Sequence, residues 1–80
     1  MMAELLKVAM QDSSSTLTRK MIQTQMFIDA CEADDLMAED KDLMVSLKTA
    51  KMTIENAINY IDNAADIMDW YIALDNGVLD

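Results

Sequence analysis

The sequence predicts an all-α fold: a helical hairpin or bundle with a short N-terminal helix, a middle helix and one long C-terminal helix, completed by oligomerisation. One observation is that proline is absent and glycine occurs once, at Gly77, because helices tolerate neither residue in their interior. Another is an apolar repeat from Leu36 to about Leu74 with spacings of three, four or seven residues. Few segments are β-branched and alternating, so residues 1–80 are expected to form a single all-helical domain.

The first expected helix covers residues 2–10, where Leu6 and Met10 can share one side. A helix of this length is marginal alone, so it must dock on another element. The polar residues 11–16 predict a break after it, because serine and aspartate compete for backbone hydrogen bonds and cap helix starts. The next N-cap is expected at Ser13 or Ser14.

The middle helix is expected over residues 14–33, with apolar residues on two opposite sides. One side carries Leu17, Met21, Phe27, Ile28 and Cys31, and the other carries Ile22, Met26, Ala30 and Ala33. This pattern predicts a helix that is buried on two sides. An acidic stretch from Glu32 to Asp42 then predicts a turn, with Asp35 or Asp40 as the N-cap of the long helix.

The long helix is expected over residues 36–75 and to end at Asn76 and Gly77, where glycine favours the left-handed conformation. Its apolar stripe consists of Met37, Met44, Leu47, Ile54, Ile58, Ile61, Ala65, Met68 and Ile72. Such a helix would be about 57 Å long, whereas the middle helix would reach only about 30 Å. The uncovered part of the stripe therefore needs another cover, from the same chain or a second one.

A row of small residues, Ala50, Ala57 and Ala64, flanks the stripe. Alanine there allows close approach of a neighbouring helix and leaves no ion pairs to specify a parallel dimer, so an antiparallel intramolecular pairing is the simpler solution. Lys51 interrupts the stripe. It is expected to pair with Glu55 one turn later or to extend past a short neighbour into solvent.

A second apolar seam lies on the other side of the long helix. Its members are Tyr60, Ile67, Trp70 and Leu74, spaced seven, ten and fourteen residues from the first. Contiguous apolar surface with aromatic anchors predicts an interface with another copy or a foreign protein. The alternative is that residues 2–10 fold back over this seam.

Small size supports oligomerisation. Chains of this length usually need a disulfide, a metal or a partner subunit for stability. Cys31 is the single cysteine and histidine is absent, so neither an internal disulfide nor a zinc site can form. Self-association is the remaining means of stabilisation.

The net charge is −9, from fifteen acidic and six basic residues. This balance argues against nucleic-acid binding and against anionic membranes, and it favours a partner protein with a basic or apolar site. The long helix carries an acidic surface of Glu55, Asp62, Asp66 and Asp69. No metal or other cofactor is expected, because carboxylate sites draw ligands from several elements. Without a signal or membrane-spanning pattern, we expect a cytoplasmic protein.

No catalytic signature is present, so an enzyme is not expected. A lesser possibility is an anion site of Ser14, Arg19 and Lys20, where hydroxyls and free N–H groups at a helix start would hold a phosphate. In an oligomer such sites would make the chain a sponge for a nucleotide-like ligand.

The favoured hypothesis is a non-enzymatic protein-binding module, a homo-oligomer that acts as an inhibitor or adaptor by occluding a partner surface. Small acidic helical chains of phages and mobile elements often inhibit defence proteins in this way, and the analogy is one of size and charge. A structural self-assembly unit is the alternative from another class.

Overall fold

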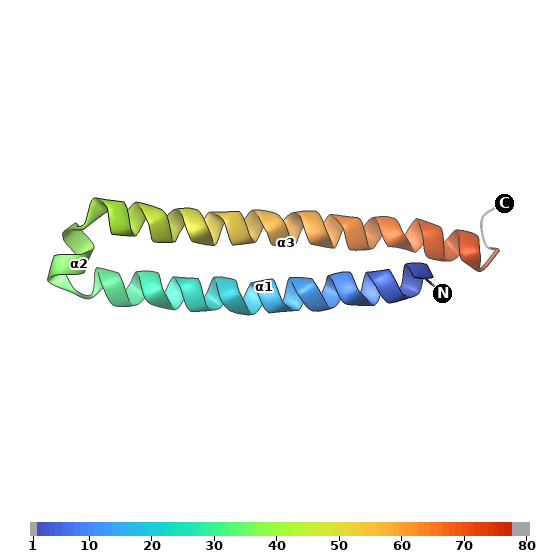
Figure 1. Ribbon diagram of the computed structural model, residues 1–80, viewed down its shortest axis with the longest axis horizontal. Helices are drawn as coiled ribbons and strands as arrows, with labels where there is room; N and C mark the ends of the chain where they lie inside the picture. Colours follow the sequence, from blue (N-terminus) through green and yellow to red (C-terminus); the bar gives the residue numbers. More distant parts are fainter. Residues whose placement is uncertain (1, 78–80) are drawn as a thin grey trace.

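The computed structural model describes residues 2–77 and forms three helices in that range: α1 (Met2–Glu32), α2 (Asp35–Glu39) and α3 (Lys41–Asp75). The long helices α1 and α3 run antiparallel side by side, with α2 at one end and both termini at the other (Figure 1). Residues 2–77 contain no strand, which confirms the all-α class. The molecule is a rod of 62 × 15 × 13 Å.

The rod shape leaves much of the chain in contact with solvent. The radius of gyration is 18.2 Å, whereas a compact domain of this length has about 12 Å. Buried positions among residues 2–77 are few, comprising Ala3, Ser14, Thr24, Ile28, Met44 and Ala65. No large side chain in the described part of the chain is completely buried. Two helices can bury only the stripe along which they touch.

The predicted break at residues 11–16 is wrong, because α1 continues through it. Ser14 is not an N-cap but a buried residue facing α3, where its hydroxyl donates a 2.6 Å hydrogen bond to Asp62. Thr18 and Thr24 donate to the carbonyl oxygens four residues earlier, at 2.9 and 2.8 Å. The weak helix propensity of these residues is thus outweighed by packing, since tertiary contacts override propensity.

The predicted acidic turn is present, but the long helix begins later than expected. α1 ends at Glu32, and Asp34 caps α2 by accepting hydrogen bonds from the backbone N–H groups of Leu36 and Met37, both at 3.0 Å. Asp40 interrupts the expected helix and caps α3 through the N–H of Leu43 at 3.1 Å. Of the two predicted caps, Asp40 is therefore correct and Asp35 is not.

The predicted apolar stripe of α3 is confirmed from Met44 onward. All of its members between Met44 and Ile72 are buried or half-buried, whereas Met37 lies in α2 and is exposed. The helix ends as expected, with Asn76 as C-cap and Gly77 at a φ of 71°, a left-handed conformation that suits glycine. The seven-residue spacing was thus sufficient to identify this contact face.

The facing stripe of α1 follows the same spacing and consists of Ala3, Lys7, Met10, Ser14, Leu17, Met21, Thr24, Ile28 and Cys31. Because α1 has 31 residues and α3 has 35, α1 covers nearly all of α3. The expected overhang of half the long helix is therefore wrong. The expectation that the middle helix is buried on two sides also fails within the chain, because Ile22, Met26 and Phe27 are exposed.

Candidate interaction surface

The two helices leave the rod with two long sides, one on each flank of the contact stripe. One, which we call the acidic side, carries the polar contacts between α1 and α3. Lys7 pairs with Asp69, Ser14 donates to Asp62, and Lys48 lies 3.7 Å from Glu32. Residues at seven-residue spacing share a helix face, so the row through Glu55, Asp62 and Asp69 runs along this side. Its charged residues on the two long helices are Glu4, Asp29, Glu32, Lys41, Lys48, Glu55, Asp62, Asp66 and Asp69.

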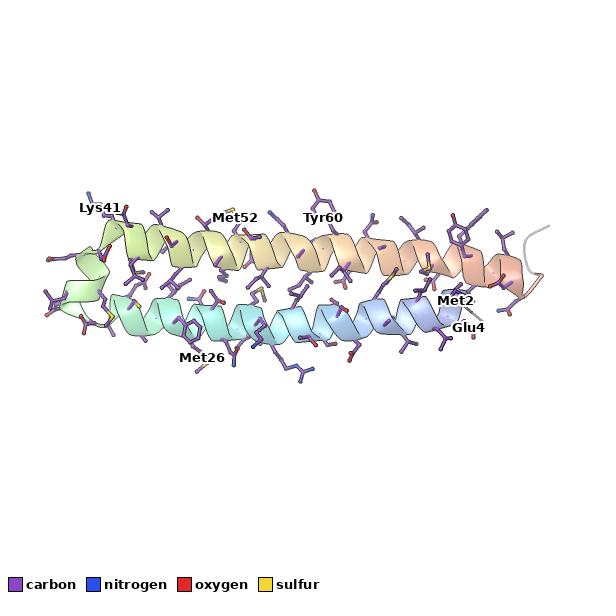
Figure 2. The ribbon with its side chains drawn as sticks, viewed as in Figure 1. Met2, Glu4, Met26, Lys41, Met52 and Tyr60 are labelled. Atoms are coloured by element: carbon purple, nitrogen blue, oxygen red, sulfur yellow. The ribbon has the colours of Figure 1, made fainter. Side chains whose placement is uncertain are left out.

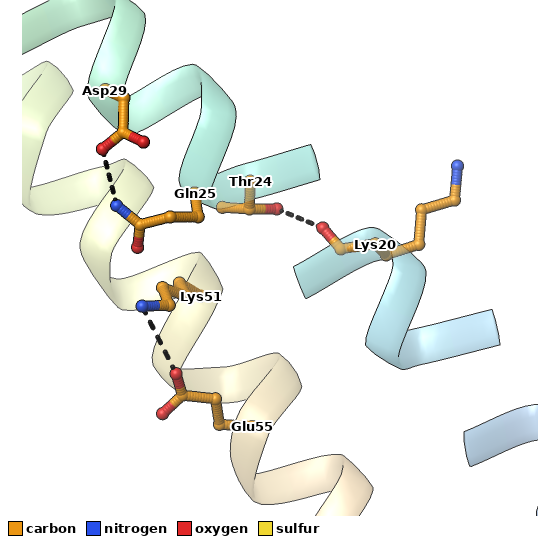
Figure 3. A network of polar contacts seen from close by, with 6 residues as sticks. All are labelled: Lys20, Thr24, Gln25, Asp29, Lys51 and Glu55. Atoms are coloured by element: carbon orange, nitrogen blue, oxygen red, sulfur yellow. Dashed lines mark hydrogen bonds and ion pairs between the residues drawn. The ribbon is translucent and has the colours of Figure 1, made fainter. Parts of the chain in front are cut away.

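A groove on the acidic side shows how these charges are arranged. It is lined by Gln25, Ile28 and Glu32 from α1 and by Lys48, Lys51, Met52 and Glu55 from α3. Lys51 reaches Glu55 at 3.6 Å, as expected from the sequence, and Gln25 donates to Asp29 at 2.8 Å (Figure 3). Most charges near the groove therefore have a neighbour of opposite sign or a hydrogen bond.

The four predicted acidic residues of α3 all lie on the acidic side, but three of them interact within the chain. Glu55 pairs with Lys51, Asp62 accepts from Ser14, and Asp69 pairs with Lys7. Asp66 makes no hydrogen bond or ion pair within residues 2–77. Asp62 and Asp69 therefore join the two helices, and all four carboxylates give the surface its charge.

The opposite flank, which we call the neutral side, is formed by the remaining rows beside the contact stripe. From α1 these are residues 2, 6, 9, 13, 16, 20, 23, 27 and 30, and from α3 residues 43, 46, 50, 53, 57, 60, 64, 67, 71 and 74. Lys20 is the one charged residue in these rows. Apart from half-buried Leu43, its large apolar members are exposed: Met2, Leu6, Phe27, Tyr60, Ile67, Tyr71 and Leu74.

The terminal end of the neutral side carries several exposed apolar side chains. A groove there is lined by Met2, Ala3 and Leu6 from α1 and by Met68, Tyr71 and Asp75 from α3. Tyr71 is also packed edge-on against Trp70, with ring centroids 4.9 Å apart. Towards the middle of the rod the same side has small residues, Ala50, Ala57 and Ala64. The neutral side is thus a nearly uncharged strip, with polar side chains along the middle of α1 from Ser13 to Gln23 and apolar ones towards its ends.

The structure places the predicted seam on the outside of α3. Tyr60, Ile67 and Leu74 belong to the neutral side, while Trp70 lies one row further round, on the back of the helix. Tyr60 points away from α1 and is 77% exposed (Figure 2). Residues 2–10 do not fold back over the seam, because they continue α1 and face Met68 and Ile72 instead.

Three apolar residues of the neutral side were missed by sequence reasoning: Leu6, Phe27 and Tyr71. Leu6 was assigned to a docked helix and Phe27 to a buried face. These residues could have been found from an absence of charge. In both helices certain rows at seven-residue spacing lack charged residues, although 26% of the chain is charged.

The candidate anion site loses its main structural ground. Ser14 lies in the middle of α1, so no free backbone N–H groups of a helix start surround it. Arg19 and Lys20 line a shallow depression with Thr16 and Gln23, and both are exposed. In Figure 3 the Lys20 side chain extends away from the other labelled residues. Two exposed cations are thus all that remains of the predicted arrangement.

Within residues 2–77 no group of three or more acidic or cysteine side chains is placed to hold a metal ion. None of the three described helices is long and apolar enough to cross a membrane.

Comparison with known proteins gives no relative: no family model matches the chain, and neither a curated protein nor a solved structure matches it. The function must therefore be inferred from the two sides of the rod.

Proposed function

We propose that this chain is a non-enzymatic protein-binding module, a homo-oligomer that acts as an inhibitor or adaptor by occluding a surface of a larger cytoplasmic protein. The observation that carries the proposal is the amount of apolar side chain left in solvent. The surface area is 5906 Å² for a mass of 9.0 kDa, about 1,000 Å² more than a compact monomer of that mass exposes. Sixteen large apolar side chains are exposed in the described part of the chain, and contiguous apolar surface marks a site of protein association.

The acidic side supports a basic partner. Its carboxylates outnumber its two lysines, Lys41 and Lys48, and the whole chain carries a net charge of −9. A surface of one sign accelerates encounter with a surface of the opposite sign and disfavours partners of like sign. Trp70, exposed beside this side, supplies an aromatic anchor of the kind that carries binding energy. A phage or mobile-element inhibitor of a defence protein fits these properties by analogy of size and charge.

The test is capture of the partner from a cell lysate, followed by its identification, purification and reconstitution with the purified chain. We expect a protein with a basic surface whose activity falls when the chain is added. Trp70→Ala should weaken that binding while helicity, measured by circular dichroism, stays unchanged.

Thr49→Ala is a matched control. Thr49 lies on the same outer row of α3 as Trp70 but much nearer the start of the helix. Capture of the chain by itself alone, or binding that is equally strong with Trp70→Ala and wild type, would contradict an outside partner.

A structural self-assembly unit is the second candidate, and the neutral side favours it. That side has the apolar surface of an interface but little of the charge needed to recognise a basic protein. The nucleotide-sponge alternative has weaker support, because Arg19 and Lys20 stand without the expected helix start. A thermal-shift screen with nucleotides should leave the melting temperature unchanged if the chain binds proteins only.

A further inference from the structure

We infer that the neutral side is the surface on which a second copy of this chain packs, and that the resulting four-helix assembly leaves both acidic sides in solvent. The inference rests on the proposed function, which includes a homo-oligomer. It adds which side of the rod forms the interface and that a second copy occupies it. It does not depend on the identity of any outside partner.

Area is the first argument. The rod measures 62 × 15 × 13 Å, so one long side covers roughly 900 Å², and a stable interface buries about 800 Å² per partner. The neutral side runs along nearly the whole length of both helices, from Met2 to Ala30 and from Leu43 to Leu74. A second rod of equal length is the occupant whose size matches a strip of these proportions.

Charge is the second argument. Each copy carries −9, and on the acidic side seven carboxylates face two lysines, so two copies would repel each other if the acidic sides met. Across the neutral side the one charge per copy is Lys20, whose long side chain can reach solvent at the edge of an interface. Packing through the neutral side therefore places the acidic surfaces as far apart as the two rods allow.

Shape is the third argument. Ala50, Ala57 and Ala64 make a row of small residues along the middle of the strip, which lets a neighbouring helix approach closely. Exposed Leu6 and Tyr71 lie beyond this row at the terminal end of the rod, and exposed Phe27 lies on α1 near the level of Ala50. A two-fold dimer uses the same patch on both copies. The strip therefore supplies both the close approach and the large apolar contacts that an obligate interface requires.

The test is the mass of the purified full-length chain, measured by light scattering and by sedimentation equilibrium over a dilution series. We expect twice the 9.0 kDa chain mass. Ala57→Glu places an unpaired carboxylate in the interface from each copy and should raise the dissociation constant about a hundredfold. Asn59→Glu adds the same charge two residues away on the acidic side and should leave the mass unchanged.

Phe27→Ser is a second variant that keeps the inference testable if Ala57→Glu disturbs folding. Phe27 is 56% exposed, so its loss opens no cavity between α1 and α3. Circular dichroism should show unchanged helicity while the mass falls to that of one chain.

A monomeric wild type would overturn the inference and the oligomeric part of the proposed function, while binding of an outside protein by the monomer would leave the rest standing. An oligomer that survives Ala57→Glu and Phe27→Ser, or one that Asn59→Glu dissociates, would overturn the inference alone.

Discussion

The acidic and neutral sides of the rod are formed by the same two helices and have the same length, yet they differ in their contacts between the helices and in their exposed side chains. The acidic side carries the polar contacts that join α1 to α3, including Lys7 with Asp69 and Ser14 with Asp62. The neutral side has no hydrogen bond or ion pair between α1 and α3 within residues 2–77, and its apolar side chains remain in solvent. The difference teaches that the polar links between α1 and α3 lie on one side only and leave the other side without them.

The contact stripe between the two sides should give the largest effect. Ile28 is 4% exposed and packs between α1 and α3, so Ile28→Ala should lower the free energy of unfolding by about 2–4 kcal/mol. Ile22→Ala is the matched control, since Ile22 is 54% exposed on the same helix and should cost well under half as much. Thermal and urea unfolding at one fixed protein concentration measure both changes. Equal losses would mean that α1 does not face α3 through Ile28.

The hydrogen bond from Ser14 to Asp62 tests the acidic side. Ser14→Ala and Asp62→Asn should each lower the free energy of unfolding by about 1 kcal/mol, because Asp62 is exposed and part of its interaction is replaced by water. The double variant should lose less than the sum of the two single losses. Ser15→Ala and Asp66→Asn serve as controls, since both side chains are exposed and neither makes a hydrogen bond or ion pair to the other helix within residues 2–77. Additive losses at Ser14 and Asp62 would show that the two side chains do not interact.

Substitutions of the helix caps at the α2 end of the rod should lower stability without distinguishing between the two sides. Asp40→Ala removes the hydrogen bond to the N–H of Leu43 and should cost about 1 kcal/mol of stability. Asp34→Ala should cost less, because Asp34 caps only α2, a short exposed helix. Amide hydrogen exchange locates the effect in the first turn of α3. Faster exchange throughout α3 with no change in that turn would argue against a local cap.

Salt should have a smaller effect than these substitutions, and its direction should differ between the two sides. Raising the salt concentration screens the repulsion between chains of net charge −9, so self-association through the neutral side should hold or strengthen. Binding of a basic partner to the acidic side should weaken in the same range. Sedimentation equilibrium and titration calorimetry measure the two trends. An oligomer that dissociates as salt rises would place the self-interface on charged residues.

The sequence was most informative where its spacing repeats without interruption. From Met44 to Ile72 the seven-residue repeat identified the contact face of α3, and Gly77 identified its end. It failed at residues 11–16, where propensity suggested a break but packing against α3 holds the helix together. Ser14 was read as a cap because its partner, Asp62, lies 48 residues away and no local pattern reveals the pairing.

The two sides could not be predicted from one helix alone. A row of residues that flanks the stripe on α1 lies beside either a charged or an uncharged row of α3. Which of the two it meets depends on the relative register and rotation of the helices, and contacts such as Lys7 with Asp69 set these. The predicted seam therefore combined two surfaces: Tyr60, Ile67 and Leu74 on the neutral side, and Trp70 on the back of α3. The spacing of residues within one helix identifies the faces of that helix. The sides of the rod combine faces of both helices, so identifying them requires knowledge of how α1 and α3 pair.

The most direct test of the difference between the two sides is hydroxyl-radical footprinting of the unmodified chain at concentrations above and below its self-association. Phe27, Tyr60 and Tyr71 report on the neutral side, and Met52, which points away from α1 in Figure 2, reports on the other flank. Burial against a second copy predicts that Phe27 and Tyr71 become protected as concentration rises, with Tyr60 at the edge following partly, while Met52 stays reactive. Modification of Phe27 and Tyr71 that is the same at all concentrations, in a sample shown to be oligomeric, would contradict the assignment of the neutral side.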